Sequence, residues 1–151
     1  MEWPLNRENY RNAPEGTTMT RLIIALGLAV GCATAASATS APTDKVTPNK
    51  HLTNGETVKV KGKGFSPAEQ VYIVECNGTV QTSGETACDL NGAVGVTTTS
   101  TGTVPTTAFV VQTGTIGNGS CGTSKADKDC YIAVAPSNLS QVAFAQIVFV
   151  P

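Results

Sequence analysis

The sequence lacks most of the residues on which catalytic and metal sites depend. It has one histidine, one tryptophan and two methionines in 151 residues, and only 14% of its residues are charged. The single histidine, His51, has no second potential ligand near it in the sequence, so we expect no metal site. A GxSxG motif and a plausible serine–histidine pair are also missing. We therefore expect that the protein is not an enzyme.

Positive charge is scarce as well. Residues 39–151 contain seven lysines and no arginine against eight acidic residues, a net charge of 7 − 8 = −1. Nonspecific nucleic-acid binding depends on clustered cations that release counterions from the phosphates. Lys59, Lys61 and Lys63 alternate along one segment, but we interpret them as the solvated face of a strand. The sequence thus predicts no direct binding of nucleic acid.

No apolar run is long enough to span a membrane. The longest, residues 22–30, follows Arg21 and precedes small residues, which is the order of a secretory signal peptide. A transmembrane helix needs about 20 apolar residues. We expect residues 19–38 to be a cleaved signal, and the protein to be secreted without a membrane span.

The signal divides the chain into three parts. We interpret residues 1–18 as an upstream extension from a start codon placed too early, and residues 39–151 as one mature domain. Cys32 leaves an alternative open, which is a lipid anchor at the cell envelope. Against it, Ala29 stands three positions before this cysteine, where a lipobox usually has leucine.

Four cysteines follow the predicted signal: Cys76, Cys88, Cys121 and Cys130. In an exported domain of this size they indicate two disulfides. Three pairings are possible. The sequential one, Cys76–Cys88 and Cys121–Cys130, is favoured because each pair brackets a loop-like segment rich in glycine, serine and asparagine. Neither pair has the CxxC spacing of redox or zinc sites.

β-Branched residues alternate with turn sequences throughout the mature domain, and no segment keeps apolar residues at helical spacing. In TVKVKGK, Val58 and Val60 fall on one face and the lysines on the other, which is typical of a strand with one buried face. In AFAQIVFV apolar residues fall on both faces, which predicts a strand covered on both sides. Seven strands are predicted in a two-sheet Greek-key sandwich, near residues 45–47, 57–63, 70–76, 94–100, 106–112, 130–135 and 143–150.

Five segments, NGETVKVKGKGFSPAEQVYIVEC, TACD, STGTVPTTAFVV, DCYIAVA and AQIVFV, occur in an order that resembles the neocarzinostatin and macromomycin family of enediyne-carrier apoproteins. The likeness covers roughly residues 43–150. It implies an all-β, immunoglobulin-like, seven-stranded antiparallel Greek-key sandwich with two disulfide-stapled hairpin loops. It also implies a secreted monomer that holds a hydrophobic small molecule, an enediyne-type chromophore, noncovalently in a cleft floored by Cys76–Cys88. DNA would be a partner only indirectly, through damage done by the ligand.

Six positions correspond to the ligand site of the chromophore carriers: Gly78, Thr86, Ala93, Tyr131, Ala133 and Ala135. The carriers have large aromatic residues at the positions of Gly78 and Ala93, an apolar residue at Thr86 and an amide at Tyr131. Aromatic pairs add about 0.5–1.5 kcal/mol beyond the burial of area, so these departures weaken the expectation of the same chromophore. Two functions stay open: a carrier of a hydrophobic small molecule, or a secreted or cell-envelope structural or interaction module that has lost its cargo.

Overall fold

A computed structural model of the protein describes residues 40–150. The predicted upstream extension, the signal peptide and Cys32 lie outside the described residues, so these interpretations stay predictions. No helix within residues 40–150 is long and apolar enough to cross a membrane.

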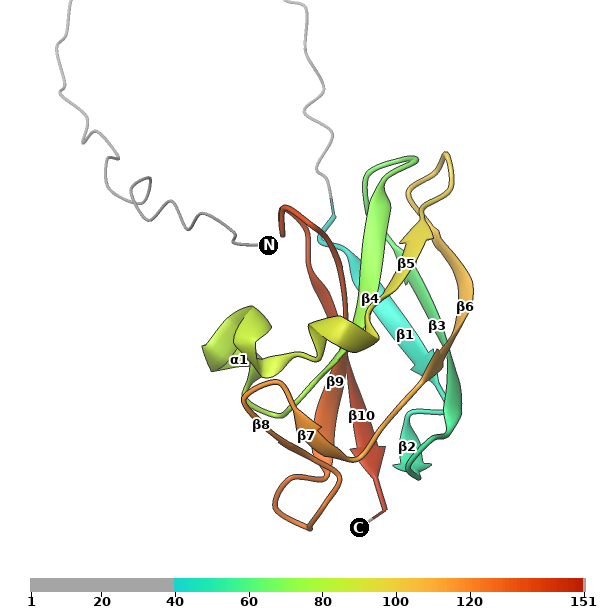
Figure 1. The fold of residues 1–151 in the computed structure, drawn as a ribbon. Coiled ribbons are helices and arrows are strands. Elements are labelled where there is room, and N and C mark those ends of the chain that lie inside the picture. The colour runs from blue at the N-terminus through green and yellow to red at the C-terminus, as the bar shows by residue number, and fades with distance from the viewer. Residues whose placement is uncertain (1–39, 151) are drawn as a thin grey trace, which may run out of the picture. The chain divides into compact units, whose positions relative to one another are not determined.

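Two sheets face each other across one hydrophobic core (Figure 1). The smaller sheet has the strand order β1 (Thr43–Thr47), β3 (Thr57–Lys63), β6 (Val104–Val110). The larger sheet has the order β2 (Lys50–Leu52), β10 (Ala143–Phe149), β9 (Asp129–Pro136), β4 (Gln70–Cys76), β5 (Val94–Thr97). The chain passes from one sheet to the other between β3 and β4 and again between β5 and β6, so the predicted all-β Greek-key sandwich is confirmed.

All seven predicted strands are present, with their ends shifted by a few residues. The predicted strand 94–100 ends early, at Thr97. The next residue, Thr98, is bound to the β3–β4 loop, where its hydroxyl donates to the carbonyl of Ser66 at 2.7 Å and accepts from the amide of Glu69 at 2.9 Å. Three strands of three residues each were not predicted: β2, which pairs parallel to β10, and the hairpin of β7 (Gly114–Ile116) and β8 (Gly119–Cys121). Segments this short carry too little periodicity to be recognised.

The core follows the predicted alternation in β3, where Val58 and Val60 are fully buried and the three lysines are exposed. Strand β10 differs from its prediction. Ile147 and Phe149 are buried in the core, but Phe144 on the opposite face remains 39% exposed. The expectation that this strand is covered on both sides is therefore wrong, and part of the outer face of the large sheet is open.

Both sequential disulfides are present, with Cα atoms 3.9 Å apart in Cys76–Cys88 and 6.0 Å apart in Cys121–Cys130. The β7–β8 hairpin leads directly into the second disulfide. The first closes a helical segment rather than a hairpin, with helix α1 (Val80–Ser83) followed by the 3-10 turn η1 (Gly84–Ala87). Threonine hydroxyls in this segment bond backward to carbonyls three residues earlier, which favours successive turns over extended strands.

Candidate functional site

The outer face of β4 and β9 gathers apolar and aromatic side chains. Because Val71 and Ile73 of β4 point into the core, the residues between them point outward. The register of the two strands pairs these outward residues in three rows, Tyr72 with Ala135, Val74 with Ala133, and Cys76 with Tyr131. Three of the predicted site residues thus form a continuous line along β9.

A second, smaller hydrophobic core covers part of this face. It consists of the Cys76–Cys88 disulfide, Val80, Ala87 and Ala133, with Val74 and Tyr131 packed against it. Ala133 is only 4% exposed. The α1 segment therefore lies over the rows of Val74 with Ala133 and of Cys76 with Tyr131. Tyr72 on β4 and Phe144 on β10 are each 39% exposed, so the rest of the outer face is open.

An open groove of about 550 Å³ lies between this disulfide-closed segment and the β7–β8 hairpin. Its lining residues are Glu85, Thr86, Cys88, Asp89, Leu90, Asn91, Thr115 and Gly117. Leu90, which belongs to the 3-10 turn η2 (Leu90–Gly92), is the one large apolar side chain of this lining and is 59% exposed. Glu85 and Asp89 give the groove two carboxylates and no cation.

The turn of the β7–β8 hairpin directly contacts the disulfide-closed segment on the other side of the groove. The amide of Asn118 donates to the carbonyl of Thr86 at 2.9 Å. Gly117 has a φ of +56°, and a Cβ atom at this position would overlap the backbone of Ala87 and Cys88. Only glycine meets both conditions without strain.

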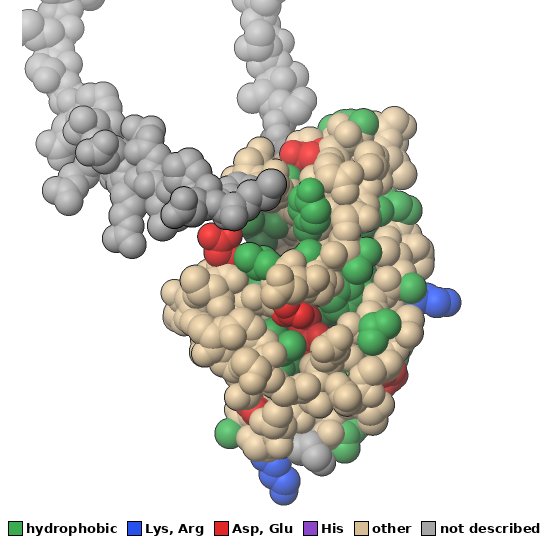
Figure 2. All heavy atoms as spheres, in the orientation of Figure 1, with side chains coloured by type: hydrophobic (Ala, Val, Ile, Leu, Met, Phe, Trp, Pro, Cys, Tyr) green, Lys and Arg blue, Asp and Glu red, His purple; other side chains and the backbone are tan. Residues whose placement is uncertain are grey.

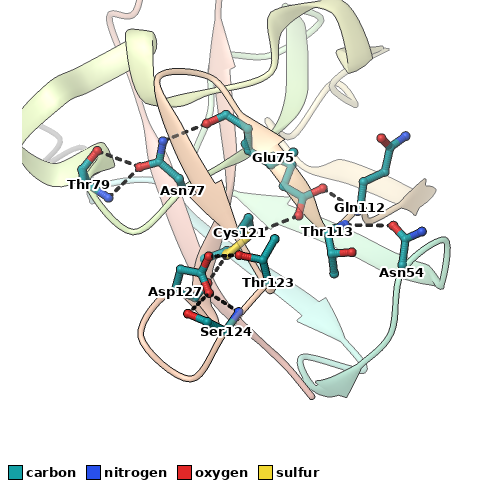
Figure 3. The surroundings of a disulfide bond; sticks show 12 residues. Asn54, Glu75, Asn77, Thr79, Gln112, Thr113, Cys121, Thr123, Ser124 and Asp127 are labelled. Atoms are coloured by element: carbon teal, nitrogen blue, oxygen red, sulfur yellow. Dashed lines mark hydrogen bonds between the residues drawn. A yellow bond between two sulfur atoms is a disulfide. The ribbon is translucent and has the colours of Figure 1, made fainter. Parts of the chain in front are cut away.

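Glu75 is a buried acid at the root of this hairpin (Figure 3). Its Oε2 accepts a hydrogen bond from the amide of Gln112 at 2.8 Å. Its Oε1 lies 3.5 Å from Sγ of Cys121, but a disulfide sulfur has no proton to donate. Burial raises the pKa of Glu75 from 4.5 to about 7, the charge of Asp89 adds to this effect, and the Gln112 hydrogen bond opposes it.

Asp127, in the loop closed by Cys121–Cys130, has a structural role. Its carboxylate accepts hydrogen bonds from the Thr123 hydroxyl and from the amide and hydroxyl of Ser124, as Figure 3 shows. The hydrogen bond from Thr123 is the largest cause that holds the pKa of this carboxyl below its ordinary value. Within residues 40–150, no three His, Cys, Asp or Glu side chains are grouped closely enough to hold a metal ion.

The model of the neocarzinostatin family matches residues 45–149 of this chain. The chain belongs to the neocarzinostatin family. Its fold is similar to the structure of macromomycin, with a TM-score of 0.56 and 24% identity over 73% of this chain and 100% of that one. It is also similar to the solution conformation of apokedarcidin, with a TM-score of 0.51 and 25% identity over 74% of this chain and 100% of that one. No curated protein matches the chain in sequence.

The predicted site residues of this neocarzinostatin-family sandwich lie in three places. Thr86 lines the groove. Tyr131, Ala133 and Ala135 lie on the outer face of β9, and only the first two of these pack within the small core under α1. Ala93, half-buried, ends the η2 turn outside the groove lining.

Gly78 is the sixth predicted position, and its surroundings explain its identity. A Cβ atom at Gly78 would come within 2.9 Å of the carbonyl oxygen of Asp129, so the large aromatic residue of the carriers does not fit here without movement of β9. The assignment of all six residues to a ligand site stays a prediction.

Most of the groove lining was not predicted from the sequence, namely Glu85, Asp89, Leu90, Asn91, Thr115 and Gly117. The sequence contained one usable signal, the GNGS turn at 117–120, which placed a tight turn between two cysteine-linked segments. Nothing in the sequence indicated that this turn would lie against Thr86, 32 residues from Asn118.

Proposed function

We propose that the protein is a secreted, monomeric carrier that binds a hydrophobic small molecule noncovalently in the groove beside the Cys76–Cys88 disulfide. Known members of the neocarzinostatin family bind enediyne chromophores and are not enzymes. By analogy, the ligand would carry the chemistry, including any damage to DNA, and the protein would shelter it. Export would use the predicted signal at residues 19–38, with a lipid anchor on Cys32 as the alternative.

The groove itself is the observation that carries this proposal. Its volume of about 550 Å³ falls in the range of about 300–1,000 Å³ that is usual for sites of small ligands. Cys88 brings the disulfide into its lining, and Leu90 offers an apolar surface that is otherwise left to water. An exposed leucine in a concave site gains free energy when a ligand covers it.

Charge narrows the chemical class of the ligand. Glu85 and Asp89 line the groove without a compensating cation, so they oppose a negatively charged molecule. On the face shown in Figure 2, acidic atoms lie near the middle as well as at the edges, and lysine atoms appear only at the margins. A neutral or cationic hydrophobic ligand fits this groove, and a nucleic-acid phosphate does not.

A second function has specific support. No aromatic side chain lines the groove. Ala133, which the family resemblance assigns to the ligand site, is buried in the small core together with Val80. A family member that had lost its cargo and become a secreted or cell-envelope interaction module would show these features. The two functions differ in whether a hydrophobic probe binds at the groove.

Titration with 2-naphthol, a neutral bicyclic aromatic probe, followed by the backbone amide NMR signals, tests the proposal. We expect shifts at Thr86, Leu90 and Thr115. Replacement of Leu90 with serine removes an apolar contact worth roughly 1–1.5 kcal/mol, so affinity should fall by about tenfold. Leu139→Ser is the matched control, because Leu139 is also exposed, at 51%, but lies in the β9–β10 loop. An absence of shifts at these residues, or equal effects of the two variants, would count against binding at the groove and favour the cargo-free module.

A further inference from the structure

The two walls of the groove come from segments that are far apart in the sequence. One wall is the chain from Glu85 to Asn91, and the other is the β7–β8 hairpin with Thr115 and Gly117. The hairpin forms its own two-stranded sheet and is not paired with either sheet of the sandwich. An isolated two-stranded hairpin is at best marginally stable in water, so its position must depend on other contacts.

Ile116 and the Cys121–Cys130 disulfide anchor the hairpin to the main core, and Asn77 provides its buried hydrogen bond to the disulfide-closed segment. The Asn77 side chain is 1% exposed and follows directly after β4. The Nδ2 atom donates to the carbonyl of Ile116 at 2.8 Å and to Oδ1 of Asn118 at 3.2 Å. The Oδ1 atom accepts from the amide and the hydroxyl of Thr79 at 2.8 and 2.7 Å (Figure 3).

These four hydrogen bonds use the full capacity of an amide side chain, two donors and two acceptor positions. They also fix its orientation, since a flipped amide would set Nδ2 against the Thr79 amide and Oδ1 against the Ile116 carbonyl. Asn77 therefore joins the first turn of the disulfide-closed segment to the tip of the hairpin.

Asn118 completes the connection from the hairpin side. Its backbone amide donates to the carbonyl of Thr86 at 2.9 Å, and its Nδ2 donates to the Thr86 hydroxyl at 3.4 Å. Space is tight around these bonds. A Cβ atom on Gly119 would lie 2.7 Å from Nδ2 of Asn77, so the hairpin approaches the segment as closely as its backbone allows.

We propose that Asn77 and Asn118 form a polar clasp that sets the width of the groove by fixing the β7–β8 hairpin against the disulfide-closed segment. Both are positioning residues, because neither Asn77 nor Asn118 lines the groove. The effect of the clasp on ligand binding rests on the proposed function. A groove that is fixed in advance spares the ligand the cost of ordering its walls, and a loosened groove releases the ligand faster.

The clasp can be tested without any ligand, by amide hydrogen exchange of the full mature chain. In Asn118→Ala and Asn77→Ala the Asn118 and Gly119 region should exchange about tenfold faster than in the wild type, because local opening no longer breaks the side-chain hydrogen bonds of the clasp. Asn138→Ala, in the exposed β9–β10 loop, should leave this exchange unchanged. Asn118→Ala keeps the test valid if the buried Asn77 variant fails to fold.

A second readout separates positioning from general loss of stability. Ile147→Val destabilises the main core through a lost methyl group and removes none of the clasp hydrogen bonds. It should lower the melting temperature and leave both the Asn118 exchange relative to the core and the 2-naphthol affinity unchanged. Asn118→Ala should weaken 2-naphthol binding by about fivefold, mainly through faster dissociation.

The outcomes distinguish the clasp from the proposed function. Faster exchange at the hairpin in the clasp variants supports the clasp even if the wild type binds no 2-naphthol, in which case only the carrier function fails. Unchanged exchange in both clasp variants overturns the clasp. Equal effects of Ile147→Val and Asn118→Ala on exchange and affinity also overturn it.

Discussion

Replacing Glu75 with glutamine should remove a pH dependence of folding stability that originates at one buried carboxyl. In the folded protein, burial raises the pKa of Glu75 from 4.5 to about 7. Below pH 4.5 both the folded and the unfolded chain keep the proton. Between pH 4.5 and 7 the unfolded chain loses it while the folded chain retains it, so stability falls as the pH rises. Above pH 7 both states are ionised and the dependence ends.

The magnitude follows from the difference between the two pKa values. A difference of about 2.5 in pKa corresponds to about 3 kcal/mol at 1.36 kcal/mol for each pH unit. That amount is a large share of the roughly 5–15 kcal/mol by which domains of this size are stable. Glutamine keeps an oxygen that accepts from the amide of Gln112, but it does not titrate.

The assay is urea unfolding of both proteins at pH values from 4 to 8. Asp44, a second carboxyl whose pKa burial raises to about 7, titrates in both proteins and cancels in the difference. The free energy of unfolding of the wild type minus that of Glu75→Gln should therefore fall by about 3 kcal/mol between pH 4.5 and 7 and then stay level. A difference that is constant or that rises with pH would refute the reasoning, because it would mean that the Glu75 carboxylate is not penalised by burial.

Three further predictions concern the disulfide segment and the chain start. Removing the first disulfide by Cys76→Ser and Cys88→Ser should lower the free energy of unfolding by about 3 kcal/mol, given its separation of 12 residues. The sandwich should stay folded, because these cysteines belong to the small core and not to the main one. An unchanged urea midpoint would contradict this prediction. Gly78→Trp should lower the melting temperature and bring no gain in 2-naphthol affinity, because a Cβ atom at this position would lie 2.9 Å from the carbonyl oxygen of Asp129. A variant that binds 2-naphthol more tightly with unchanged stability would show that the position has room for a side chain. The secreted protein should emit only tyrosine fluorescence, because the sole tryptophan of the sequence, Trp3, precedes the predicted signal. Tryptophan emission from the native product would show that cleavage does not occur at residue 38.

Much of the sandwich was predictable because it follows from local patterns. Val58 and Val60 alternate with lysines, and such alternation identifies a half-buried strand without knowledge of its neighbours. The cysteine pairing was also predictable, since each pair brackets one polar segment. The buried acid could have been found in the same way, because Glu75 shares the alternation of Val71 and Ile73 in QVYIVEC and so points into the core.

The groove could not be predicted, because it depends on contacts between segments without a shared pattern. Asn77 has no periodic partner in the sequence, and its bonds to Ile116 and Asn118 span 39 and 41 residues. The exposure of Phe144 was missed for a related reason. Its apolar side chain suggested burial, but the small core under α1 includes residues of β4 and β9 and none of β10, where Phe144 lies beside Ala133.

The most direct test of a carrier function is native mass spectrometry of the protein purified in the dark from the culture medium of its producing cells, compared with its denatured mass. The carrier function predicts a native mass that exceeds the denatured mass by several hundred daltons, the size range of a drug-like ligand that fills such a pocket. The two disulfides predict a denatured mass four hydrogens below that of the reduced chain. Equal native and denatured masses would contradict a filled carrier and favour the module without cargo.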